Sequence, residues 1–296
     1  MRLMGPRVHL SEHVPAEIVR ALEADFELVA SPVGADGVVA MLTVTVDDAY
    51  LDAAGPQLRI VANYAVGVNN IDLDAARRRG IVIANTPDVL TGATAELALT
   101  LMLSLLRRVT EGDRFVRRRE PWQFSLEFML GERLEGKTVL VVGAGRIGRE
   151  TARLVEAFGA VAVLAGREAD LDELLPQADV VSLHVPLTPE TRHLIDARRL
   201  GLMKRKAVLI NTARGPVVDE AALAAALVDG TIAGAGLDVY EREPEVHEGL
   251  LGLENVVLAP HLGSATRDTR VAMGMLCVSA LRAVLLEGRT PPNVVT

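Results

Sequence analysis

The sequence predicts an α/β protein made of two domains with parallel sheets. Short apolar runs alternate with helical patterns along most of the chain, which is typical of parallel strands joined by crossover helices. A glycine-rich turn at residues 143–148 directly follows one of these strands and precedes a helix. The length of 296 residues fits two medium-sized domains better than a single core.

A first alternating series covers residues 7–85. Its expected strands are residues 7–10, 26–30, 37–42, 58–63 and 81–85, and its expected helices are residues 16–24, 47–54 and 73–79. Gly80 follows three arginines, which is typical of a helix end, because cations favour the carbonyl end and glycine can turn left-handed.

A long helix is expected from Thr94 to Val109, after Pro87 ends the first series. This helix is apolar nearly all round and must be covered on most sides, either between the chain's own domains or between two subunits. Its most apolar stretch, Leu97 to Leu106, is far too short to span a bilayer.

A second alternating series begins at Lys137. Its expected strands are residues 137–143, 161–165, 179–186, 207–213, 234–239 and 255–260, and helices are expected between them, including Glu220 to Asp229. A last helix is expected from about Thr266 to Glu287.

The composition excludes several classes of function. Hydrophobic residues make up 50% of the chain and charged ones 24%, which indicates a globular protein. The net charge of −8 disfavours a nucleic-acid partner. Cys277 is the only cysteine, so an intrachain disulfide and a cysteine-based zinc site are both impossible, and no metal site is expected. The first ten residues lack the apolar run of a signal peptide, and we expect a cytoplasmic protein without membrane contact.

The glycine-rich turn predicts a dinucleotide site in a Rossmann-type domain. Gly143, Gly145 and Gly148 have the order Gly-x-Gly-x-x-Gly between a strand and a helix. The first glycine permits a tight turn, the second lets a pyrophosphate approach the backbone, and the third lets helix and strand pack closely. The N–H groups at the start of the helix then face the phosphates.

The end of the second strand of this domain indicates which dinucleotide is bound. An NAD site usually has a carboxylate there for the ribose 2′-hydroxyl, but this chain has Gly166 and Arg167. A glycine leaves room for a 2′-phosphate, and a guanidinium can bind its oxygens, although Glu168 would weaken that contact. We therefore favour NADP(H), with NAD(H) as the alternative.

A dinucleotide site without a flavin, cysteine or metal motif suggests hydride transfer to carbon, which requires a proton donor for the forming alkoxide. Of the six histidines, His184 and His261 end strands, where ligands of open parallel sheets bind. His261 is preferred because the small residues that follow it, including Gly263, allow a ligand to approach. Arg214 also ends a strand and can pair with a substrate carboxylate.

An acidic residue is expected to orient the histidine. The stretch "VYEREPEV" offers Glu241, Glu243 and Glu245, and reasoning from the residues alone does not choose among them.

At these positions the chain resembles the D-isomer-specific 2-hydroxyacid dehydrogenase family along nearly its whole length. The motifs "NYAVGVNNID", "NTPDVLTGATAELAL", "GRIG", "SLHVPLTPETRHLI", "NTARGPVVDE", "GLDVYEREP" and "APHLGSAT" occur in the family's order. The resemblance implies that Arg214 binds and polarises the substrate, that His261 donates the proton, and that Glu243 is its partner. It also implies that the backbone of Val66 and Gly67 holds the substrate carboxylate.

The resemblance also implies a larger cofactor-binding set and narrows the activity. The expected set is Thr94, Gly143, Gly145, Arg146, Ile147, Gly148, Gly166, Arg167, His184, Val185, Pro186, Thr191, Thr212, Ala213, Asp238 and Gly263, with Asp238 beside the nicotinamide. Within the family, these motifs are most similar to those of glyoxylate/hydroxypyruvate reductases, which commonly prefer NADPH.

The family's architecture implies a Rossmann domain at residues 90–267 and a smaller, discontinuous, flavodoxin-like substrate domain made of residues 1–89 and 268–296. Family members are typically homodimers, and the helix from Thr94 to Val109 would suit that interface. The chain departs from the family where residues 28–37 and 167–179 are shortened, the latter lacking an extra loop and strand.

The sequence therefore predicts NAD(P)H-dependent reduction of a small anionic 2-oxoacid, such as glyoxylate or hydroxypyruvate, to the D-2-hydroxyacid. Two alternatives stay open at this point. One is a related dehydrogenase acting on 3-phosphoglycerate, D-lactate or a bulkier acid. The other is a dinucleotide-sensing scaffold of the corepressor type, for which the catalytic residues would be dispensable.

Overall fold

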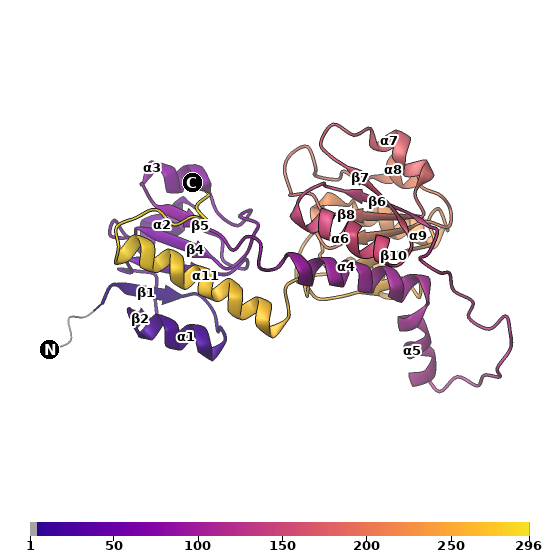
Figure 1. The fold of residues 1–296 in the computed structure, drawn as a ribbon, viewed down its shortest axis with the longest axis horizontal. Coiled ribbons are helices and arrows are strands. Elements are labelled where there is room, and N and C mark those ends of the chain that lie inside the picture. Colours follow the sequence, from indigo (N-terminus) through magenta and orange to yellow (C-terminus); the bar gives the residue numbers. More distant parts are fainter. Residues whose placement is uncertain (1–4, 296) are drawn as a thin grey trace. The chain divides into compact units, whose positions relative to one another are not determined.

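A computed structural model describes residues 5–295, and the chain divides into two compact units (Figure 1). The first unit comprises Met1–Leu90 and Ala265–Thr296, and the second comprises Thr91–Ser264. The chain thus leaves the first unit once and returns to it with its last helix. The expected domain limits at residues 89 and 268 lie within three residues of these boundaries, while the assignment of substrate to one domain and dinucleotide to the other stays a prediction.

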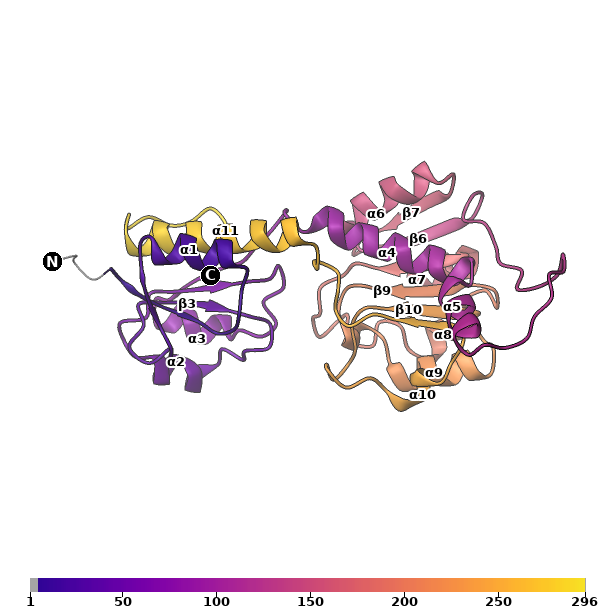
Figure 2. The same cartoon turned by 90° about the horizontal axis from the view of Figure 1, so that it is seen from below.

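The first unit contains a five-stranded parallel sheet in the order β2-β1-β3-β4-β5. This is the strand order of flavodoxin-like sheets, as expected. The strands are β1 (Arg7–Leu10), β2 (Glu27–Val29), β3 (Gly37–Ala40), β4 (Ile60–Asn63) and β5 (Val82–Ala84). Helices α1 (Ala16–Glu23) and α11 (Arg267–Leu285) cover one face, and α2 (Asp48–Ala54) and α3 (Leu73–Arg78) cover the other (Figure 2).

The second unit contains a six-stranded parallel sheet in the order β11-β10-β9-β8-β6-β7. Its strands are β6 (Thr138–Val142), β7 (Val161–Ala165), β8 (Val180–Leu183), β9 (Val208–Asn211), β10 (Gly234–Leu237) and β11 (Val256–Leu258). One face is covered by α4 (Thr91–Leu106) and α6 (Arg146–Ala157). The other is covered by α8 (Ala197–Leu202) and α9 (Glu220–Val228), with α10 (Glu248–Leu251) beside α9.

Both shortened regions form short connections between strands, with fewer secondary-structure elements than the family implies. Residues 30–36 join β2 to β3 without a helix. Between β7 and β8 the chain forms only α7 (Leu171–Leu174) and the 3₁₀ turn η1 (Leu175–Gln177), and no strand occurs in that described stretch. Strand β7 is therefore the edge of the sheet, which leaves the residues after it open on one side.

The long apolar helix is buried within its own unit. Helix α4 packs against α6 and against β9, β10 and β11, all of which belong to the second unit. It ends three residues before the expected Val109, because Arg108 adopts a left-handed conformation and a separate helix α5 (Val109–Arg117) follows. The sequence analysis did not anticipate α5, which has no buried residue.

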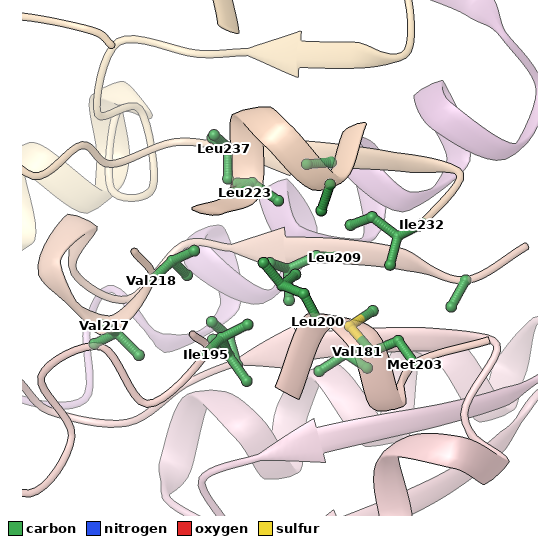
Figure 3. Packing of buried hydrophobic residues seen from close by; sticks show 14 of the residues in the cluster. Val181, Ile195, Leu200, Met203, Leu209, Val217, Val218, Leu223, Ile232 and Leu237 are labelled. Atoms are coloured by element: carbon green, nitrogen blue, oxygen red, sulfur yellow. The ribbon is translucent and has the colours of Figure 1, made fainter. Parts of the chain in front are cut away.

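Successive apolar side chains of each strand point to opposite faces of the six-stranded sheet and form a core on each face. Leu209, at the centre of β9, packs with Val181 and Leu237 on the face covered by α8 and α9 (Figure 3). Its neighbours Val208 and Ile210 belong to the core on the α4 and α6 face. Because the strands are buried on both faces, their register is strongly specified, and the positions of their carboxyl ends follow from it.

Within residues 5–295, no helix is both long and apolar enough to cross a membrane. The same described residues contain no group of three or more histidine, cysteine or acidic side chains arranged to hold a metal ion.

Candidate active site

Except for Thr94 in α4 and Thr191 in the loop before α8, the residues expected to bind the dinucleotide follow the carboxyl ends of six strands in the second unit. They occupy the turn after β6 (Gly143 to Gly148), β7 (Gly166, Arg167), β8 (His184 to Pro186), β9 (Thr212, Ala213), β10 (Asp238) and β11 (Gly263). Because all six strands are parallel, these ends lie along one edge of the sheet, which is where open α/β sheets bind ligands.

The glycine turn has the geometry that a pyrophosphate requires. Gly143 has a φ of 108°, and a side chain there would meet the His184 carbonyl oxygen at 2.5 Å. Gly148 faces the Gly143 carbonyl oxygen, which a Cβ would approach to 2.0 Å. Gly145, by contrast, has open space above it and caps α6 without a side-chain hydrogen bond. The open space at Gly145 lets a phosphate approach the start of α6, where helices bind anions, and the turn fits a dinucleotide.

Two further side chains after neighbouring strands fit a bound dinucleotide. The Thr212 hydroxyl is buried and has no hydrogen-bond partner among the described residues. The His184 ring Nε2 lies 2.8 Å from the Ser182 hydroxyl, and burial lowers the pKa of His184 to about 4. His184 is therefore neutral at physiological pH. A neutral imidazole is a poor proton donor near neutral pH, which favours His261 over His184 for that role.

His261 and Glu243 form the closest pair of the expected catalytic residues. The Nδ1–H of His261 donates to Glu243 Oε2 at 2.7 Å, and both side chains are about one-third exposed, at 34% each. Burial raises the pKa of the Glu243 carboxyl, but the hydrogen bond and charge of His261 outweigh this effect and leave the pKa below its ordinary value. With Nδ1 engaged, Nε2 is the ring atom left to exchange a proton with a substrate.

Asp238 holds His261 in an unusual backbone conformation. His261 is left-handed, with a φ of 55°, which costs free energy for a residue with a Cβ. Its N–H donates to the Asp238 carbonyl at 2.9 Å, and the next two N–H groups, of Leu262 and Gly263, donate to the Asp238 carboxylate at 2.6 and 2.8 Å. Burial raises the pKa of Asp238 despite these donors. Thr94 also reaches this loop, since its hydroxyl donates to the Gly263 carbonyl at 3.1 Å.

Arg214 is tied to the turn that carries Glu243. A Cβ on Gly215 would lie 1.8 Å from the carbonyl carbon of Tyr240, so only glycine lets these two backbones pack together. Arg214 donates to the Ala213 carbonyl at 2.6 Å, and its backbone carbonyl accepts from Asn211 at 2.9 Å. Burial lowers the pKa of Arg214, and the charge of Glu243 opposes that change. Glu243 is thus the neighbour that His261 and Arg214 share.

The structure separates the three glutamates that the sequence left equivalent. Glu243 reaches His261, whereas Glu241 accepts from the Glu220 N–H at 3.0 Å and lies 3.2 Å from the His193 ring. Glu245 only closes the turn, through its N–H and the Arg242 carbonyl. Glu241 therefore supports the loop and Glu243 supports the histidine.

Tyr240 is a supporting residue that the sequence analysis missed. Its N–H donates to Glu243 Oε1 at 3.0 Å, and its hydroxyl donates to the carbonyl of Ala259, two residues before His261, at 2.9 Å. It thus links both members of the histidine–glutamate pair. A tyrosine after a buried strand gives no local signal of this role, because both of its partners are set by the tertiary fold.

The expected substrate-carboxylate residues, Val66 and Gly67, lie after β4 in the first unit. Their contribution to the site stays a prediction, as do the individual roles assigned to the cofactor-binding residues, including Arg146, Ile147 and Thr191.

Comparison with known proteins identifies the family of the chain. The family described as D-isomer specific 2-hydroxyacid dehydrogenase, NAD binding domain, matches residues 99–263. A glyoxylate reductase of Thermococcus litoralis is 43% identical, and the alignment covers 99% of this chain and 97% of that protein.

Two solved structures have the same fold over nearly the whole chain. A protein of Thermus thermophilus superposes with a TM-score of 0.91 at 42% identity, covering 98% of this chain and 100% of that one. An NADPH-dependent glyoxylate/hydroxypyruvate reductase of Sinorhizobium meliloti, solved with NADP and malonate, has a TM-score of 0.86 at 36% identity and covers 98% and 97%.

Two glycine substitutions should separate binding from folding in the glycine turn. Gly145→Ala places a methyl group in open space, so thermal stability should be unchanged while the Kd for NADPH rises by about tenfold or more, since a well-placed phosphate contact is lost. Gly148→Ala forces α6 away from the Gly143 carbonyl and should lower the Tm. Gly201→Ala, also in open space but in α8, is the control and should change neither property. Normal NADPH binding by Gly145→Ala would contradict the proposed pyrophosphate site.

Proposed function

The chain belongs to the D-isomer-specific 2-hydroxyacid dehydrogenase family and is an NAD(P)-dependent dehydrogenase, and we propose that it reduces glyoxylate and hydroxypyruvate. Two findings support this substrate class. The Thermococcus relative is a glyoxylate reductase, and the Sinorhizobium structure is that of a glyoxylate/hydroxypyruvate reductase. The observation that carries the proposal is the contact between His261 and Glu243, with Arg214 as the cation next to Glu243.

Each of these side chains has a separate task in the proposed reaction. A bound reduced nicotinamide supplies the hydride. Arg214 pairs with the carboxylate of the 2-oxoacid and polarises its carbonyl oxygen, because a guanidinium offers several donors in one plane. His261 Nε2 donates a proton to that oxygen as negative charge develops on it. In the reverse direction the same nitrogen accepts the proton of the hydroxyacid.

Glu243 keeps His261 ready for this proton transfer. The carboxylate accepts only, so it selects the ring form with a proton on Nδ1 and stabilises the doubly protonated ring electrostatically. The lowered pKa of Glu243 means that it stays ionised throughout the neutral range. Asp238, through the backbone of His261, Leu262 and Gly263, fixes the direction in which the ring points.

We favour NADPH over NADH as the reductant. No carboxylate stands directly after β7, where the first residue is Gly166, and the space around its Cα is open. Arg167 is exposed at the same strand end, and its charge contributes to the lowered pKa of Glu190, after the larger effect of the Thr188 hydroxyl. A cationic side chain beside an open glycine suits a 2′-phosphate better than a free 2′-hydroxyl.

We also propose that the protein acts as a homodimer in the cytoplasm. The segment after α5 carries the most exposed large apolar side chains of the second unit, Phe124 at 83% and Leu126 at 86% exposure. Beside α4, a surface hollow of about 640 Å³ is lined by residues that include Leu103, Val109 and Phe158. Exposed apolar side chains and an apolar hollow of this kind are suited to an interaction site, and a second copy would offer a matching segment and hollow.

Replacing His261 by alanine should lower kcat by at least about 100-fold, because the general acid is lost. The Kd for NADPH should stay within twofold of the wild type, since the ring is not among the groups proposed to bind the cofactor. Stopped-flow NADPH oxidation with glyoxylate measures the first quantity and NADPH fluorescence the second. His9→Ala, in the first unit, is the matched control and should behave as wild type. Unchanged turnover in His261→Ala would remove this residue as the proton donor.

Replacing Arg167 by alanine should weaken NADPH binding by about tenfold while leaving NADH binding nearly unchanged, because only NADPH carries the 2′-phosphate. The measurement is the ratio of kcat/KM for the two reduced cofactors with one substrate. Arg153→Ala, an exposed arginine of α6 paired with Glu150, controls for the loss of a positive charge. Equal losses for both cofactors would rule out the phosphate contact.

Introducing two charges into the exposed segment, Phe124→Asp with Leu126→Asp, should convert the protein to a monomer. Light scattering after gel filtration should give a wild-type mass of about twice the 31.6 kDa chain mass and a variant mass close to that of one chain. Leu251→Asp, at a residue 60% exposed in α10, is the control and should leave the mass unchanged. A wild-type protein that elutes as a monomer would contradict the proposal.

A further inference from the structure

Three consecutive carbonyl groups after β4 are all held by hydrogen bonds from their own unit. The Ala65 carbonyl accepts from the Thr86 N–H at 2.9 Å, and the Val66 carbonyl accepts from the side-chain amide of Asn85 at 2.8 Å. The Gly67 carbonyl accepts from the side-chain amide of Asn63, also at 2.8 Å. Side-chain amides thus hold two carbonyls of a loop that forms no regular structure.

Both asparagines are themselves fixed. Asn63 ends β4 and is fully buried, and its Oδ1 accepts from the Asn70 amide at 3.2 Å, while that amide also donates to the Val44 carbonyl at 3.0 Å. Asn85 follows β5, and its backbone N–H donates to the Asn293 carbonyl at 3.1 Å. The side chain of Asn293 donates in return to the Asn85 carbonyl. Turning the Asn63 amide would break its contact with Asn70, and the backbone that carries the Asn85 side chain is held by Asn293.

The direction of the carbonyls sets the direction of the neighbouring N–H groups. In a trans peptide the C=O and the N–H of the next residue point in opposite directions. The N–H groups of Val66 and Gly67 therefore point away from Thr86 and Asn85, and that of Val68 points away from Asn63. Within residues 5–295, none of these three N–H groups donates to a protein acceptor. Successive N–H groups that are free to donate are suited to binding a carboxylate.

We propose that Asn63 and Asn85 are positioning residues for the carboxylate of the 2-oxoacid: they hold the Val66 and Gly67 carbonyls so that the N–H groups of this loop face the substrate. This inference rests on the proposed function and deepens it. The loop after β4 then contributes neutral donors whose directions are fixed by the two side-chain amides. Asn63 and Asn85 need not touch the substrate, because they act through the peptide groups.

Asn85 offers the sharper test because it is only half-buried. Asn85→Asp keeps the size of the side chain but replaces the amide donor by an acceptor that repels the Val66 carbonyl, and Asn85→Ala removes the donor without adding charge. Both variants should raise the KM for glyoxylate and the inhibition constant of oxalate by about tenfold or more, as expected for one lost set of contacts to a charged group. The fold-change in kcat should be smaller than that in KM, and the Kd for NADPH should stay within twofold of the wild-type value.

Asn255→Ala is the matched control. Its side-chain amide also holds carbonyls, those of Leu227 and Ala233, but it lies just before β11, at the amino end of the second sheet. It should lose a similar amount of thermal stability and keep the wild-type KM. Asn63→Ala provides a second, independent variant with the same expected rise in KM if either Asn85 variant folds poorly.

The outcomes distinguish this inference from the proposed function. A wild-type protein that does not oxidise NADPH with glyoxylate contradicts the proposed function, and oxalate binding measured by calorimetry in the presence of NADPH then decides the role of the asparagines. An unchanged KM in Asn85→Asp and Asn85→Ala would overturn the inference. So would a rise in the Kd for NADPH as large as the rise in KM, because that result would indicate general disruption.

Discussion

The active-site chemistry depends on the parallel register of six strands. Because β6 to β11 all run in one direction, every turn that follows a strand opens at the same edge of the sheet, and turns that are distant in the chain lie along that edge. The core fixes this register, since a shift of one residue would turn Leu209 out of one apolar layer and Ile210 out of the other. Burial on both faces thus determines where the turns that carry Gly143, Arg214 and His261 lie along this edge.

Buried polar groups then orient the catalytic side chains that the strand register brings to this edge of the sheet. The left-handed backbone of His261 is unfavourable in isolation, and it persists because the Asp238 carboxylate accepts two N–H groups of the same loop while the Asp238 carbonyl accepts a third. Tyr240 and Gly215 act similarly on the other side of the pair, one by hydrogen bonds and the other by allowing two backbones to pack together. Rigid support of this kind orients a catalytic side chain before the substrate arrives.

The sequence could predict those parts of the site that follow directly from strands and turns. The glycine triplet, Arg214 and His261 each follow an apolar strand, so local pattern and residue chemistry were sufficient to single them out. Reasoning from residues could not choose among Glu241, Glu243 and Glu245, because only the tertiary fold decides which carboxylate faces the histidine. Helix α5 was missed because it buries no residue and has charged side chains at four of its nine positions. Tyr240 and Asn85 contact backbone carbonyls 19 residues away, and Asn63 contacts that of Gly67 within an irregular loop, so no helix or strand spacing links them to their partners.

The proposed combination of a guanidinium with oriented peptide N–H groups explains how a protein with a net charge of −8 can select an anion. Long-range attraction is absent, so selection must come from groups that contact the carboxylate directly. A cluster of cations would bind many anions, competing phosphates included. One guanidinium combined with oriented N–H groups demands instead a planar, two-oxygen group in a particular direction. Peptide N–H groups add no charge repulsion, but they discriminate only if their directions are held, and holding them requires buried amides such as Asn63. Specificity for a small 2-oxoacid is, on this argument, a property of backbone orientation as much as of catalytic side chains.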